Sequence, residues 1–123
     1  MNSKTTLQLL EFILESTALI QKRTKTITNA DDFLKDDENI MRYESILMRL
    51  QATGEALKNL HKRDKAFLYL VADETYWSAI IRFREIVSHH YIDIQAEEVF
   101  SICKNHIQIL EEKIQQLKER LCD

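Results

Sequence analysis

Apolar residues recur every three or four positions along most of the chain, which is the period of an α-helix that buries one face. The first such segment runs from about Thr5 to Lys22, and its stripe consists of Leu7, Leu10, Leu14 and Ala18. The same period predicts a second helix from about Glu38 to Leu60, with Asp36 or Asp37 as its N-cap. The pattern therefore indicates helices that face a common core.

Two further helices are predicted in the second half of the chain. One begins at Asp73 or Thr75 and carries the segment WSAIIRFREIVSHHY, residues 77–91. The other runs from about Ile94 to Arg120. Its apolar residues recur at the two core positions of a heptad repeat: Phe100, Cys103, Ile107, Leu110, Ile114, Leu117 and Leu121. This heptad predicts coiled-coil-like antiparallel packing within a bundle.

Composition supports the same architecture. The 123 residues include one glycine and no proline, whereas turn-rich β folds depend on both. We therefore expect an all-α fold, an up-and-down bundle of four to five helices that forms a single domain over residues 1–123. Gly54 falls inside the second predicted helix, where glycine costs up to about 1 kcal/mol against alanine. We expect another helix to cross there, close to the backbone.

Charge, cysteines and the N-terminal segment narrow the functional classes. The net charge of −3 argues against a surface that is basic throughout, so any contact with nucleic acid has to be local. Cys103 and Cys122 match neither a disulfide framework nor a metal-ligand spacing. Glu11 and Glu15 interrupt the apolar N-terminal segment, which predicts no signal peptide, no membrane span and a cytoplasmic location.

One spacing in the chain suggests chemistry, Arg84-x4-His89-x-Tyr91. At about 100° per residue, Arg84 and His89 are about 140° apart around an ideal helix. Either the helix ends near His89, or a second copy of the chain completes the group across a dimer interface. The structural alternative is a cationic helix C-terminus that complements the helix dipole. Glu85 and His89 are four residues apart and within reach of a hydrogen bond.

Several separate blocks carry a resemblance to a known family. The third predicted helix contributes Trp77, Ile80, Ile81, Phe83, Arg84, Val87, His89 and Tyr91, and Asp93, Glu98 and Val99 follow. The second helix contributes Gly54-Glu55-Ala56, and the acidic region around Phe33 fits the segment before it. In these blocks the chain resembles the HepT family of the HEPN superfamily, and the resemblance covers most of its length.

The resemblance implies a function and a role for each residue of the motif. It implies a ribonuclease toxin with Arg84 and His89 as the catalytic pair, acting on RNA as a homodimer without a metal or other cofactor. It also implies a nucleotidyltransferase antitoxin of the MntA type as partner, which attaches AMP to Tyr91. With one glycine, this chain itself lacks the Gly-Ser loop of a nucleotidyltransferase.

Neighbouring residues are assigned to substrate binding, namely Arg82, His90 and Glu85. Two of them depart from the family pattern, which has a small polar residue where Glu85 stands and often glycine where Arg82 stands. Glu85 places a negative charge beside the scissile phosphate, and Arg82 offsets it. Glu55 is interpreted either as a solvated helix residue or as a group that lines the same cleft.

Two other classes remain open at this point. One is a non-catalytic subunit that binds substrate or scaffolds a two-component nucleotidyltransferase, and Glu85 favours it. The other is an unrelated helical oligomerisation module, which only the heptads of the last helix support.

Overall fold

The computed structural model describes residues 3–89 and 92–122, and this part of the chain is helical with no strand. The elements are α1 (Ser3–Thr24), the 3-10 helix η1 (Ala30–Leu34), α2 (Asp37–Leu68), α3 (Glu74–His89), α4 (Ile92–Asn105) and α5 (Ile107–Cys122). The predicted all-α bundle of four to five helices is therefore confirmed. Within the described ranges, no helix is long and apolar enough to cross a membrane.

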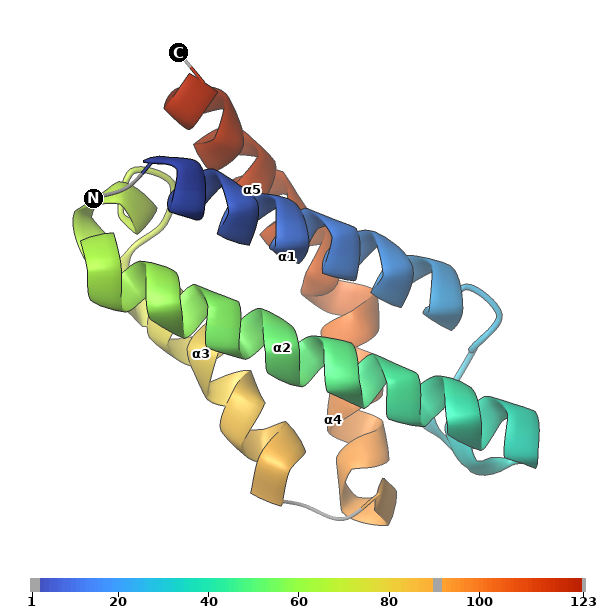
Figure 1. The fold of residues 1–123 in the computed structure, drawn as a ribbon. Coiled ribbons are helices and arrows are strands. Elements are labelled where there is room, and N and C mark those ends of the chain that lie inside the picture. Colours follow the sequence, from blue (N-terminus) through green and yellow to red (C-terminus); the bar gives the residue numbers. More distant parts are fainter. Residues whose placement is uncertain (1–2, 90–91, 123) are drawn as a thin grey trace.

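The helices pack in neighbouring pairs (Figure 1). α1 and α2 lie side by side and run in opposite directions, α5 packs along α1, and α3 packs along α2. α4 continues into α5 and contacts η1 and the end of α1. α2 is thus the main neighbour of α3, which matters for the candidate site.

The core consists of two clusters of buried side chains. One joins α1, η1, α2, α4 and the start of α5, and contains Ile20, Ile27, Ala30, Phe33, Tyr43, Ile46, Leu50, Ala96, Val99, Ile102, Cys103 and Ile107. The other joins α1, α2, α3 and α5, and contains Leu10, Ile13, Ala56, Leu57, Leu60, Leu68, Trp77, Ile80, Leu110, Ile114 and Leu117. Phe83 of α3 is half-buried and packs against both clusters.

Two helix boundaries differ from the sequence prediction. α2 continues past Leu60 to Leu68, with a break at Asp64, whose φ of −161° and ψ of 78° are not helical. The single helix predicted up to Arg120 is divided at His106 into α4 and α5. α4 packs in the first core cluster together with Ile107, and α5 beyond Ile107 packs in the second.

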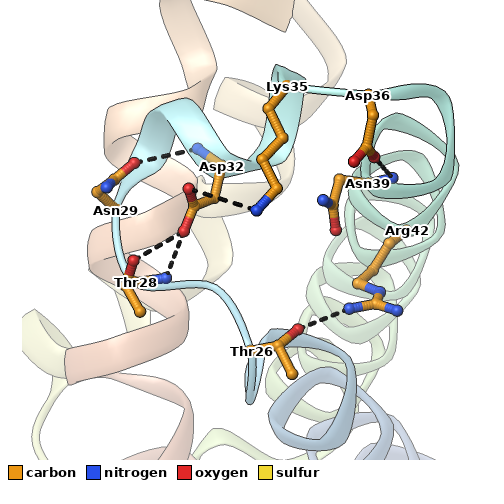
Figure 2. A network of polar contacts seen from close by, with 8 residues as sticks. All are labelled: Thr26, Thr28, Asn29, Asp32, Lys35, Asp36, Asn39 and Arg42. Atoms are coloured by element: carbon orange, nitrogen blue, oxygen red, sulfur yellow. Dashed lines mark hydrogen bonds and ion pairs between the residues drawn. The ribbon is translucent and has the colours of Figure 1, made fainter.

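Side chains fix the connection between α1 and α2 (Figure 2). Asn29 caps η1 by accepting a hydrogen bond from the Asp32 backbone N–H, at 3.1 Å. Asp32 in turn accepts hydrogen bonds from the backbone N–H and the hydroxyl of Thr28, both at 2.8 Å. Asp36 caps α2 through the backbone N–H of Asn39, as predicted. The two hydrogen bonds from Thr28 hold the pKa of Asp32 below its ordinary value, and the bond from the backbone N–H contributes most.

Candidate functional site

The candidate site lies where α3 crosses α2 at Gly54. A Cβ atom built on Gly54 would lie only 2.7 Å from the Cβ atom of Arg84. Non-bonded carbon atoms normally stay about 3.5–4.0 Å apart, so no larger residue fits here without a shift of α3. The expectation that a second helix crosses at this glycine is confirmed, and the residue brought to the crossing is Arg84.

Arg84 lies between two carboxylates. Its Nη1 donates a hydrogen bond to Oε1 of Glu55 on α2, at 2.9 Å. Its Nη2 lies 4.0 Å from Oε1 of Glu85, the next residue on α3. The side chain of Arg84 is only 22% exposed, whereas those of Glu55 and Glu85 are 50% and 58% exposed. The guanidinium is therefore held at the edge of the bundle by a residue of another helix.

From the sequence, Glu55 is interpreted either as a solvated helix residue or as a group that lines the cleft, and the structure agrees in part with each. Its carboxylate is half exposed to solvent, and it also contacts the candidate catalytic arginine. The sequence signal for this contact is the preceding glycine. A glycine inside a helix indicates a close helix crossing, and a long side chain beside it can reach the neighbouring helix. Spacing within the motif of residues 77–91 could not reveal it, since Glu55 is on a different helix.

The other predicted site residues are described to different extents. Arg82 and Glu85 are exposed residues of α3. His89 is the last residue of α3 in the described range, and its side chain lies outside the described part. His90 and Tyr91 lie outside the described residues altogether. The structure thus brings Arg84, Glu55 and Glu85 together, and the places of His89, His90 and Tyr91 in the site stay predictions.

A second polar cluster joins the end of α2 to the start of α3. Nε2 of His61 lies 3.3 Å from Oε2 of Glu74 and 3.3 Å from the hydroxyl of Tyr69. Ser78 donates a hydrogen bond to the other oxygen of Glu74, at 2.9 Å. The pKa of Glu74 is lowered, first by Ser78 and then by His61. The cluster therefore ties the C-terminal part of α2 to the first turns of α3.

Metal ligation has no support in the described part of the chain, where no group of three or more His, Cys, Asp or Glu side chains could hold an ion. A charge-stabilising group is nevertheless present at the helix crossing. A guanidinium presents its donors in a planar fork, which matches the oxygens of a phosphate group.

The described helices form an all-α bundle with an arginine at a helix crossing, and a comparison with protein families identifies the class of protein to which the chain belongs. Residues 13–117 match the model of the HepT-like family, described as ribonuclease HepT-like. The chain belongs to this ribonuclease family, within the HEPN superfamily. No solved structure matches the chain at a significant level.

Proposed function

We propose that this protein is the toxin of a HepT/MntA-type toxin–antitoxin pair and cleaves RNA with Arg84 and His89. The observation that carries the proposal is the match of residues 13–117 to a ribonuclease family. The fixed position of Arg84 at the α2–α3 crossing supports the part assigned to that residue.

The cleavage needs a base, a nucleophile and a group that stabilises charge. In the proposed reaction the neutral imidazole of His89 accepts the proton of a ribose 2′-hydroxyl, and the 2′-oxygen attacks the adjacent phosphorus. Arg84 stabilises the negative charge that accumulates on the phosphoryl oxygens. The bond to the 5′-oxygen breaks, this oxygen takes up a proton from solvent, and the products are a 2′,3′-cyclic phosphate and a 5′-hydroxyl group.

A homodimer accounts for the angular separation of the two catalytic residues. On an ideal helix, residues spaced like Arg84 and His89 are about 140° apart, so a single helix would not bring the two side chains together. A second copy related by a two-fold axis would place its own His89 across the interface. In this arrangement Arg82 and His90 of both copies bind the RNA backbone, and the basic surface stays local on a net-acidic chain.

Tyr91 provides the means of control in this proposal. A nucleotidyltransferase antitoxin of the MntA type transfers AMP from ATP to its hydroxyl, two residues after the catalytic His89, and releases pyrophosphate. The added phosphodiester brings a bulky anion close to the group that receives the RNA phosphate. RNA is then excluded by steric overlap and by repulsion between like charges.

The decisive experiment is expression of the wild-type chain and of His89→Ala without the antitoxin. We expect the wild type to arrest growth and to cleave RNA in vitro, and His89→Ala to do neither. His61→Ala is the matched control, because it removes a histidine that contacts Glu74 and Tyr69 and lies outside the site. A wild-type chain that is harmless and leaves RNA intact contradicts the proposal.

The control step has its own test in co-expression with the nucleotidyltransferase. We expect an AMP-sized mass increment on the peptide that contains Tyr91, loss of toxicity, and no increment in Tyr91→Phe. An increment that persists in Tyr91→Phe would place the modification on another residue.

The two carboxylates around Arg84 favour one alternative, a non-catalytic subunit of a two-component nucleotidyltransferase. Glu55 and Glu85 together carry more negative charge than Arg84 neutralises. Such a subunit would leave RNA intact and would raise the activity of the nucleotidyltransferase on its own substrate.

A further inference from the structure

Glu55 connects Arg84 on α3 to α2. It follows directly after Gly54, so the close approach of α2 and α3 brings its carboxylate to Arg84. The distance of 2.9 Å from Nη1 to Oε1 is that of a charge-assisted hydrogen bond, the stronger kind in proteins. The contact exists only because the two helices cross here, since the residues belong to different elements.

A long arginine side chain has many rotamers, and ordering it at the moment of reaction opposes catalysis. A partner that orders it beforehand removes this cost from the reaction and keeps the charge where it is needed. Arg84 is 22% exposed, so the crossing already restricts its stem. The guanidinium at the end of this stem is the group that Glu55 contacts.

We propose that Glu55 is a positioning residue for RNA cleavage, whose carboxylate holds the Arg84 guanidinium at the α2–α3 crossing in the orientation that meets the scissile phosphate. The inference rests on the proposed function and adds a residue from outside the motif of residues 77–91. Glu55 acts through Arg84 and does not itself contact the RNA.

Glu85 does not share this role, although it is also a carboxylate near Arg84. Its Oε1 lies 4.0 Å from Nη2, which is beyond hydrogen-bond distance. It is also next to Arg84 on the same helix, so it does not connect the guanidinium to α2. Glu55 and Glu85 are therefore expected to respond to substitution in opposite directions.

The test compares the RNA cleavage kinetics of Glu55→Ala and Glu55→Gln with those of the wild type. Glu55→Ala removes the contact, and we expect kcat to fall by about tenfold or more while KM changes by less than about threefold. Glu55→Gln keeps the side-chain length and an acceptor oxygen, and we expect it to restore most of the rate. Unchanged melting temperatures separate this effect from a loss of folding.

Glu44 offers a matched control, because it is an exposed glutamate on the same face of α2, about three helical turns earlier. Glu44→Ala and Glu44→Gln should retain wild-type kcat and KM. If Glu55→Ala is as active as the wild type or faster, the positioning role is wrong, and the faster rate would mean that Glu55 blocks the site. If the wild type itself does not cleave RNA, the proposed function fails instead.

A spectroscopic measurement tests the contact independently of activity. Nitrogen-15 spectra of arginine side chains resolve separate Nη signals when an ion pair slows rotation of the guanidinium. The Arg84 signals, assigned by their loss in Arg84→Lys, should be separate in the wild type and merge in Glu55→Ala. Signals that stay separate in Glu55→Ala would contradict the positioning role.

Discussion

A methyl group at position 54 would lie 2.7 Å from Cβ of Arg84. The backbones of α2 and α3 can therefore approach this closely only because residue 54 has a hydrogen atom in place of a side chain. Glycine normally weakens a helix interior, and its replacement by alanine in an exposed helix is stabilising by up to about 1 kcal/mol. At this position the neighbouring atom is a Cβ, close to the backbone of α3, and cannot move aside as the end of a flexible side chain could.

Gly54→Ala is therefore expected to lower the free energy of unfolding despite the better helix propensity. Overpacking of this kind costs about 1–3 kcal/mol, which exceeds the gain of about 1 kcal/mol. Displacement of Arg84 should also lower kcat, by up to about 100-fold for a shift of about 1 Å. Urea denaturation and initial cleavage rates measure the two effects. Gln51→Ala, an exposed position on the same helix, should change neither.

Glu85→Gln is expected to strengthen RNA binding, because it removes a negative charge 4.0 Å from the Arg84 guanidinium. Two charges at this distance in water interact by about 1 kcal/mol, which corresponds to a change in Kd of about fivefold at most. The gain should shrink as salt increases. Titration of an uncleavable 2′-O-methyl RNA at two salt concentrations measures it, with Glu112→Gln on α5 as the exposed control. An unchanged Kd at low salt would show that Glu85 does not oppose the phosphate.

At the scale of elements, the side-chain bonds between α1 and α2 make the stability of that connection depend on pH. The lowered pKa of Asp32 means that its carboxylate stabilises the folded state above the ordinary value of 3.8 and loses this effect as pH falls through the lowered pKa. Asp32→Asn should therefore melt at a lower temperature than the wild type at neutral pH.

The difference in melting temperature should disappear in acid, where the wild-type carboxyl group is also protonated. Thermal melting of both proteins between neutral and acid pH measures it, and Asp31→Asn, a neighbouring exposed position, is the control. A difference that stays constant over this range would exclude the carboxylate as its source.

Periodicity predicted which segments are helical and which faces are buried, because one face of each helix has to meet a core. Ile107, Leu110, Ile114 and Leu117 of the predicted heptad are buried as expected. Periodicity could not predict the division at His106, since the pattern is the same on both sides of it. Nor could it identify Asn29 as the cap of η1, because Asp31 and Asp32 follow closely and Asn and Asp cap helices about equally well.

At the scale of the whole molecule, the proposed dimer determines which copy contributes each catalytic residue. Co-expression of Arg84→Ala with His89→Ala gives mixed dimers in which one site is intact if the two residues come from different copies. We expect about one quarter of the wild-type cleavage rate in such a mixture, because about half of the dimers are mixed and each has one of two sites. No recovery would mean that each site is built within one copy.

The sequence predicted only part of the candidate site. The motif residue Arg84 and the crossing at Gly54 followed from local sequence, whereas the Arg84–Glu55 contact depends on how α2 and α3 pack. Contacts between helices require the three-dimensional arrangement, and a spacing along one helix contains no information about them.

Phe83, next to Arg84, packs against both core clusters, and this has a consequence for cooperativity. The two clusters occupy different halves of the bundle, and a side chain shared by both makes it unfavourable for one half to unfold while the other stays intact. A phosphate ligand bound at Arg84 would consequently protect amides in both halves from hydrogen exchange, including those of helices far from the ligand.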